Sequence, residues 1–193
     1  VTVQDYATAL HASSLIRDGG TLQIGIGSLG DAVAHACLLR EKENDAYRAI
    51  HSALTHQQTG LADDLGAFNE GLYVSTEMFV NGMMHLIEQG VVKRRVFDDL
   101  NLQKGLNSGA ISESVDETLF DYGRTCGLIP RRLDEASLQQ LAYWGILPRE
   151  LVLEGNQLRL NGTELPNDLD EEATRQAILA AVAGTQLQQG RIL

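Results

Sequence analysis

Cysteine is scarce in this sequence, and the lack of a cysteine pattern excludes two classes of small protein. The chain has two cysteines, Cys37 and Cys126, which lie far apart and form no CxxC or histidine-rich spacing. A disulfide framework and a structural zinc site both need a denser, more regular set of cysteines. We therefore expect two reduced thiols in a cytoplasmic protein and no metal site.

Long apolar runs and basic clusters are also missing. No stretch approaches the roughly 18 apolar residues of a membrane-spanning helix, and residues 1–20 mix charged and apolar side chains, unlike a signal peptide. The net charge is −11, and the longest basic run is residues 93–95. Because nucleic acids are bound by clustered Lys and Arg, we expect neither a nucleic-acid nor a membrane partner. The first residue is Val1 rather than Met, which predicts a part of a longer or processed protein.

The sequence does contain a succession of patterns typical of an α/β protein. A short apolar run is followed by a glycine-rich turn and then by an amphipathic helix pattern, which is how an α/β unit begins. A second apolar run is likewise followed by a helix pattern that ends at a glycine. These patterns predict helices over residues 3–17, 31–40 and 79–89, and strands over residues 21–26, 71–75 and 91–97.

The second half of the chain has a different character. Residues 113–123 and 134–145 are predicted as short helices, and Gly155-Asn156 predicts one β-hairpin over residues 152–165. A final helix is predicted over residues 168–183, with Asp168 or Asp170 as its N-cap. We divide the chain near residue 125. This gives an α/β domain at 1–125 and a helical and hairpin segment at 126–193, interpreted as an insertion.

The polar stretch between the two α/β patterns is predicted to be a loop over residues 56–69. His51 and His56 flank it without a carboxylate at metal-ligand spacing, which supports no metal site. His35 and His85 fall within predicted helices, where packing or surface exposure is more common than a role as a base.

The glycine turn fits two known patterns, of which the first is a dinucleotide-binding turn. Gly25, Gly27 and Gly30 match G-x-G-x-x-G between a strand and a helix, and Asp45 lies at about the distance of a ribose-binding acid. Asp31 opposes this interpretation, because it puts a negative charge at the helix N-terminus where a pyrophosphate would bind. Asp45 also follows a predicted helix rather than a strand. A purely structural tight turn remains a third interpretation.

The second pattern combines two segments, TLQIGIGSLGDAV and LYVSTEMFVNGMMHLIEQGVV. In this order they resemble the acetyl-CoA hydrolase/transferase family, in which a GIG-type turn precedes a strand ending in Thr-Glu-Met and then a helix. Thr76, Glu77 and Met78 match that tripeptide, and the likeness covers about residues 15–97. The family turn usually has Pro where this chain has Gly30. The resemblance implies a partial CoA-transferase-like open sheet with flanking helices, as a fragment of a larger enzyme.

The resemblance also implies roles for particular residues. Glu77 corresponds to the catalytic glutamate of the family, and the turn that lies against the thioester end of acyl-CoA corresponds to Gly25, Ile26, Gly27 and Ser28. Coenzyme A is then a substrate rather than a cofactor, the partners are acyl-CoA and a carboxylate acceptor or water, and a homo-oligomer is an option.

The residues themselves are compatible with this chemistry. A carboxylate that follows a strand of a parallel sheet points into the crevice where ligands bind, and the apolar run before Glu77 is unusual for a solvated acid. We expect Glu77 to attack a thioester and form an anhydride and then a glutamyl-CoA thioester. Glycines would let backbone N–H groups approach the developing oxyanion. The alternative is a nucleotide-binding or purely structural module, with Glu77 as a helix cap or surface acid.

Overall fold

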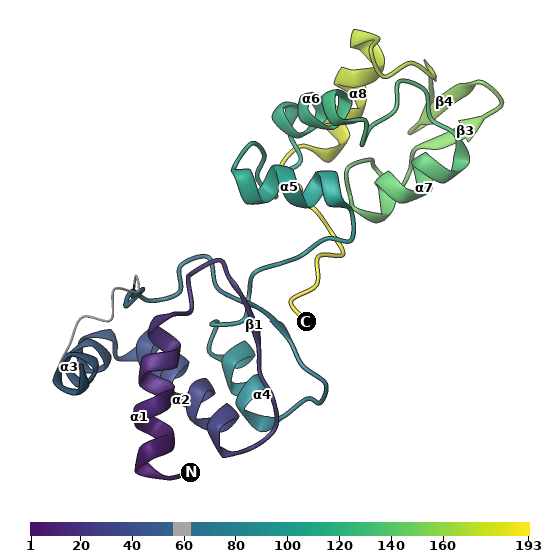
Figure 1. Ribbon diagram of the computed structural model, residues 1–193. Coiled ribbons are helices and arrows are strands. Elements are labelled where there is room, and N and C mark those ends of the chain that lie inside the picture. The colour runs from purple at the N-terminus through teal and green to yellow at the C-terminus, as the bar shows by residue number, and fades with distance from the viewer. Residues whose placement is uncertain (56–62) are drawn as a thin grey trace. The chain divides into compact units, whose positions relative to one another are not determined.

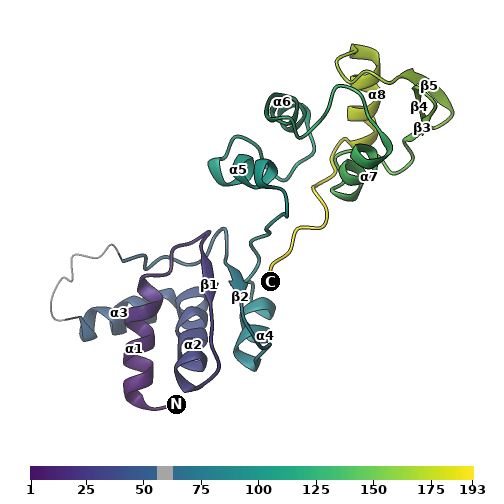
Figure 2. The same ribbon diagram turned by 45° about the vertical axis from the view of Figure 1, so that its right-hand side comes forward.

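A computed structural model describes residues 1–55 and 63–193, and it divides the chain into two compact units. Unit 1 comprises Val1–Val96 with Arg191–Leu193, and unit 2 comprises Phe97–Gly190. Figure 1 labels most of the elements of both units, and β2 and β5 are labelled in Figure 2. The described residues form a mixed α/β structure with a two-stranded parallel sheet in unit 1 and a three-stranded antiparallel sheet in unit 2.

Unit 1 contains two parallel strands and the helices beside them (Figure 2). The strands β1 and β2 pair in register, with Gln23 opposite Ser75. The predicted strand at 91–97 forms only isolated bridges, one between Leu72 and Val92 and one between Val96 and Arg191. The elements are α1 (Val3–Ser14), β1 (Thr21–Gln23), α2 (Ser28–Lys42), α3 (Asn44–Leu54), β2 (Tyr73–Ser75) and α4 (Asn81–Glu88).

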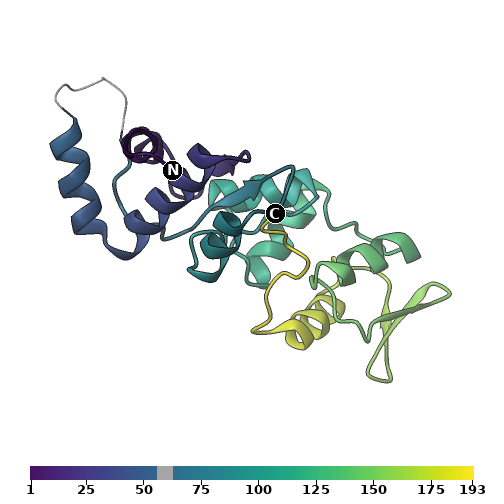
Figure 3. The ribbon, with the colours of Figure 1, turned by 90° about the horizontal axis from the view of Figure 1, so that it is seen from below.

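Helix α2 is buried on two sides, and its small residues make this packing close. Ala32 and Ala36 belong to a cluster with residues of α1, whereas Ala34 and Cys37 belong to a cluster with strand residues and α4. Helix α1, seen nearly end-on in Figure 3, packs against both α2 and α3. On the strands, burial alternates, so that one face of the sheet is covered and Thr21, Gln23 and Ser75 stay exposed. The helices therefore fix the position of the turn that follows β1.

The segment before β2 is held by a buried arginine. Arg40 of α2 is fully buried, and its guanidinium donates to the carbonyl oxygens of Ser13, Ile16 and Gly66 and pairs with Asp64 at 2.8 Å. A buried cation is tolerated only with such partners. The predicted loop at 56–69 lies partly outside the described residues, including His56.

Unit 2 consists of four helices and a three-stranded antiparallel meander in the described residues. The segment predicted as one hairpin, residues 152–165, contains three strands rather than two. The strands β3 and β4 form a hairpin around Gly155-Asn156, and β5 follows a second turn at Asn161-Gly162, where both residues have positive φ. The predicted helices are present, together with a helix at residues 100–108 that the sequence analysis did not identify. The elements are α5 (Leu100–Ser108), α6 (Glu117–Cys126), α7 (Glu135–Tyr143), β3 (Val152–Glu154), β4 (Gln157–Leu160), β5 (Thr163–Pro166) and α8 (Glu172–Val182).

The start of α8 differs from the expectation. Its N-cap is Glu171, not Asp168 or Asp170. Asp168 accepts three hydrogen bonds from Arg131, at 3.0, 3.1 and 2.7 Å, and Asp170 pairs with Arg124 at 2.8 Å. Both carboxylates are thus engaged by arginines from other parts of unit 2, and neither caps the helix.

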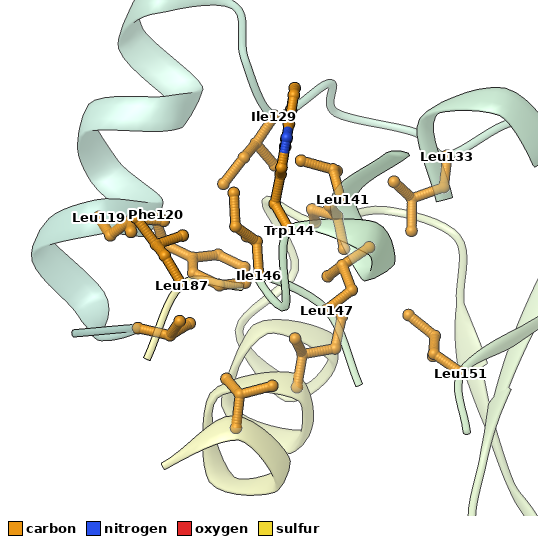
Figure 4. Packing of buried hydrophobic residues seen from close by; sticks show 14 of the residues in the cluster. Leu119, Phe120, Ile129, Leu133, Leu141, Trp144, Ile146, Leu147, Leu151 and Leu187 are labelled. Carbon is orange, nitrogen blue, oxygen red and sulfur yellow. The ribbon is translucent and has the colours of Figure 1, made fainter. Parts of the chain in front are cut away.

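Unit 2 has its own apolar core (Figure 4). Leu119 and Phe120 of α6 pack with Trp144, Ile146 and other buried side chains of this unit. Leu119 and Phe120 belong to this core although they precede residue 125. Along the chain, the boundary between the two units falls between Val96 and Phe97, whereas the sequence patterns placed it near residue 125. Residues 97–125, which the sequence patterns assigned to the first domain, lie within unit 2.

Candidate functional site

The glycine turn and the Thr-Glu-Met tripeptide lie at the same edge of the unit 1 sheet. Residues 25–28 follow β1, and residues 76–78 follow β2. Because the two strands are parallel and paired, their carboxyl ends meet. Ligands of open α/β sheets bind at this edge. The two segments that carry the family resemblance are therefore neighbours, although about fifty residues separate them in the chain.

Two glycines give the turn its shape. Gly27 has φ +121°, a conformation that residues with side chains rarely adopt, and it is the N-cap of α2. Gly30 lies so close to the turn that an added Cβ would be 2.3 Å from the Gly25 carbonyl oxygen. Helix α2 thus begins in contact with the turn backbone. A Pro at position 30, as the family usually has, would need a wider turn than the one in this chain.

The tripeptide is tied to the turn by a hydroxyl group. Thr76 Oγ1 donates to the carbonyl oxygen of Ile24 at 3.1 Å and lies 2.7 Å from the carbonyl oxygen of Met78. The Ile24 backbone N–H donates to the Ser75 carbonyl oxygen at 3.3 Å. From the sequence, Thr76 was recognisable only as part of the Thr-Glu-Met motif, because the partner of its hydroxyl depends on the strand register.

Glu77 is exposed to solvent. The expectation that the apolar run before it removes this carboxylate from solvent is wrong for the described structure. That run is buried only on alternate residues, and β2 ends at Ser75, so the chain has left the sheet before it reaches Glu77. Large apolar side chains around the site are exposed as well: Ile26 is 65%, Met78 58% and Phe79 56% exposed.

Two cavities border the glycine turn. One of about 510 Å³ is lined by residues from the starts of α2 and α4, and one of about 280 Å³ lies between the turn and α2. Neither helix start has a hydrogen bond from a capping side chain, so the N–H groups of both first turns lack that usual partner. The first cavity is lined by Val1, Ile26, Gly27, Ser28, Asp31, Phe79, Val80 and Asn81, and the second by Gln23, Ile24, Gly25, Ile26, Leu29, Gly30 and Val33.

The turn residues predicted to contact substrate thus fall into two groups. Gly25 lines the smaller cavity, Gly27 and Ser28 line the larger, and Ile26 lines both. Phe79 and Asn81 were not predicted as site residues, since nothing in their pattern distinguishes them from ordinary residues at a helix start. Their position follows from the pairing of β1 with β2.

The dinucleotide-binding interpretation needs an acidic residue at the end of a strand to bind the ribose, and the structure does not place Asp45 there. Asp45 lies in the first turn of α3, not at the end of a strand. Asp31 lies in the first turn of α2 and lines the larger cavity, where its carboxylate would repel a phosphate.

Other candidate groups have local packing roles. His35 packs edge-to-face on Tyr6 with ring centroids 5.3 Å apart, and His85 lies 3.4 Å from Glu88 on the surface of α4. Burial raises the pKa of Cys37 to about 12, against the opposing effect of the Arg40 charge, so this thiol is no nucleophile. Over residues 1–55 and 63–193, no group of three or more His, Cys, Asp and Glu side chains is arranged to hold a metal ion.

No helix in the part of the chain that the structure describes is long and apolar enough to cross a membrane. Comparisons with protein-family models, with curated proteins and with solved structures found no match to this chain.

Proposed function

We propose that this chain carries the nucleophilic glutamate of an acyl-CoA transferase or hydrolase, as part of a larger protein, and that Glu77 is that nucleophile. The observation that supports the proposal best is the contact between the two motif segments. Thr76, which precedes Glu77, donates a hydrogen bond to the carbonyl of Ile24 at the beginning of the glycine turn. A thioester bound at this sheet edge could therefore meet both the carboxylate and the turn.

The proposed reaction begins when a carboxylate oxygen of Glu77 attacks the thioester carbonyl carbon. The carbon–sulfur bond breaks, CoA leaves as a thiolate, and an acyl-glutamyl anhydride remains. The thiolate then attacks the glutamyl carbonyl, which releases the acyl group as a carboxylate and leaves a glutamyl-CoA thioester. In each of these reaction steps one bond to a carbonyl carbon forms and another breaks, so no oxidant or reductant is needed.

The second half of the reaction depends on the acceptor. In a transferase, an acceptor carboxylate attacks the glutamyl thioester and expels CoA, and the thiolate then attacks the acceptor's carbonyl in the new anhydride. This yields a new acyl-CoA and restores Glu77. In a hydrolase, water attacks the glutamyl thioester, and CoA and the free Glu77 carboxylate result.

The glycine turn is suited to the oxyanion that forms in each addition step. Its exposed glycines have no side chains to block a ligand from the backbone. The uncapped start of α2 adds the partial positive charge of a helix N-terminus. Backbone N–H groups aimed at a developing oxyanion are typically worth ~10²–10³ in rate per donor. Asp31 lines the same cavity, and its negative charge opposes the oxyanion as it opposes any other anion there, so stabilisation has to come from the backbone N–H groups.

The exposed apolar side chains around Glu77 also fit a surface that is covered during the reaction. Ile26, Met78 and Phe79 would lose their contact with water when acyl-CoA or another part of the larger protein packs against them. Excluding water strengthens the electrostatic interactions of the site.

The test is chemical trapping of the glutamyl-CoA thioester. The protein that carries this chain is incubated with acetyl-CoA and then with borohydride, which reduces a thioester to an alcohol. We expect peptide mass spectrometry to find reduction at Glu77. Glu77→Gln should abolish both the modification and CoA exchange, whereas Glu88→Gln, a matched change at an exposed glutamate of the same unit, should alter neither. Retained exchange in Glu77→Gln would refute the proposal.

A nucleotide-binding module is the second candidate, and the close contact of Gly30 with the Gly25 carbonyl favours it. In dinucleotide-binding turns the third glycine has this packing role. The two candidates differ in their ligands. Thermal unfolding that shifts with NAD but not with CoA would support the second candidate, and the reverse would support the first.

A further inference from the structure

The ladder between β1 and β2 ends in an unusual way at the candidate site. The Ile24 N–H donates to the Ser75 carbonyl, as expected in a parallel pair. In a ladder that continued, the Ile24 carbonyl would next accept from the backbone N–H of Glu77. Here that carbonyl accepts from the Thr76 hydroxyl instead, at 3.1 Å. A side chain thus replaces the backbone group that would keep Glu77 in the strand.

The same hydroxyl also contacts the other side of Glu77. Thr76 Oγ1 is 2.7 Å from the Met78 carbonyl oxygen, so one oxygen atom lies between the carbonyl that precedes the turn and the carbonyl that follows Glu77. A hydroxyl has a single proton and donates to one of these carbonyls at a time. With either partner, Thr76 restrains the backbone at Glu77. Thr76 is itself half-buried, whereas Glu77 and Met78 are exposed.

We propose that Thr76 is a positioning residue for Glu77: its hydroxyl ends β2 one step early and restrains the backbone from which the exposed Glu77 side chain extends. This inference rests on the proposed function. An exposed side chain on an unrestrained bend would sample many orientations, and a nucleophile gains reactivity when its approach is restricted to the productive one. The hydroxyl touches backbone carbonyls of the chain, so it acts through Glu77.

The experiment compares three substitutions at Thr76 in the protein that carries this chain. Thr76→Val keeps the shape and removes the hydroxyl, Thr76→Ser keeps the hydroxyl, and Thr76→Ala is a second variant without it. The readouts are the rate of borohydride-trapped modification of Glu77 at saturating acetyl-CoA and the acetyl-CoA concentration that gives half the maximal rate. Amide hydrogen exchange of residues 76–79 is measured in parallel.

A matched control is available in unit 2. Thr125 donates its hydroxyl to the Asp121 carbonyl at 2.8 Å on an exposed helix surface. Thr125→Val removes the same kind of bond far from Glu77 in the chain, so it should leave both the trapping rate and the exchange of residues 76–79 unchanged.

We expect Thr76→Val and Thr76→Ala to slow modification of Glu77 about tenfold or more, with little change in the half-saturating concentration and with faster exchange at residues 76–79. A tenfold change in rate corresponds to the free energy of about one hydrogen bond. Thr76→Ser should stay within about twofold of wild type. Rescue by serine is the outcome that a requirement for side-chain shape alone does not predict.

Other outcomes overturn the inference. Equal rates in wild type and Thr76→Val, or a serine variant as slow as valine, would show that the hydroxyl does not position Glu77. Loss of cooperative unfolding in both Val and Ala variants would make the hydroxyl a folding requirement instead. If the wild type forms no adduct at Glu77, the proposed function fails and this role fails with it. An adduct in wild type with an unaffected Thr76→Val removes only the positioning role.

Discussion

Val96 and Arg191 exchange both of their backbone hydrogen bonds, at 2.8 Å and 2.9 Å, although all of unit 2 lies between them in the chain. The chain leaves unit 1 and returns to it at adjacent positions. Next to Arg191, the carbonyl of Ile192 accepts from the backbone N–H of Val74, so the returning segment is bonded to β2 as well. Unit 2 is therefore an insertion at one point of unit 1, and it is larger than the segment interpreted as an insertion from the sequence.

This pairing predicts that unit 2 can be removed without unfolding unit 1. Val96 and Arg191 form an antiparallel pair, and a two-residue Asn-Gly turn can connect two antiparallel strands. We expect a chain that lacks residues 97–190 and carries this turn to keep its helical circular dichroism and to unfold cooperatively. Residues 97–190 expressed alone should also unfold cooperatively, because this unit has its own apolar core.

The control is a longer deletion that begins inside unit 1 instead of at its boundary. Removing residues 91–190 takes away Val96 and the Leu72–Val92 bridge as well, and should give a chain without a cooperative transition. Unfolding of the first variant without a transition would contradict the insertion model of unit 1.

Gly30→Ala should destabilise unit 1 even though alanine is the better helix former. The helix preference of alanine is worth about 1 kcal/mol, but its Cβ would lie 2.3 Å from the Gly25 carbonyl oxygen, a backbone atom. Overpacking of this kind costs about 1–3 kcal/mol. Urea unfolding measures the net effect, which we expect to be a loss of stability. Gly25→Ala is the matched change, since its Cβ meets no atom within 4 Å, and it should change stability by less than about 0.5 kcal/mol.

Acid should lower the stability of unit 2, because it protonates the Asp168 carboxylate. The hydrogen bonds from Arg131 lower the pKa of this carboxyl from 3.8 to about 2, against the opposing effect of burial. A carboxyl with a lower pKa in the folded state than in the unfolded state stabilises the fold above its unfolded value, and this stabilisation is lost as the pH falls through the folded value. The contribution of Asp168 should therefore be complete above about pH 4 and disappear toward about pH 2.

The measurement is the thermal midpoint of residues 97–190 between about pH 2 and pH 5. Asp168→Asn should flatten this profile and lower the midpoint mainly at the upper end of the range. Arg131→Gln should flatten it similarly, because it removes the cause of the shift. A profile in Asp168→Asn as steep as in wild type would assign the acid sensitivity to other carboxyl groups.

Much of the local structure of this protein could be predicted from the sequence. The helices α1, α2 and α4 and the first hairpin of unit 2 follow from the spacing of apolar residues and from glycines with positive φ at their ends. Such patterns depend on residues a few positions apart. The helix α5 was missed because its apolar residues are few. The residues of β5 were included in the predicted hairpin, but the turn at Asn161-Gly162 that makes them a third strand was missed.

At the candidate site, too, local motifs were predictable from the sequence and contacts between distant segments were not. The sequence identified the glycine turn and the Thr-Glu-Met tripeptide, and the structure brings them to one edge of the sheet. The exposure of Glu77 and the bond from Thr76 to Ile24 were not predictable, since both depend on which strand β2 pairs with and in which register. A shift of one residue in that register would turn every side chain of the strand to the other face.

The amino-acid sequence by itself determined where helices and turns begin, because those preferences come from local backbone sterics and apolar spacing. Only the tertiary structure decided that the chain divides after Val96, that Arg191 pairs with Val96, and that the Thr76 hydroxyl bonds to the Ile24 carbonyl. These features are contacts between residues distant in the chain, and their partners are chosen by the packing of the whole unit rather than by any one segment.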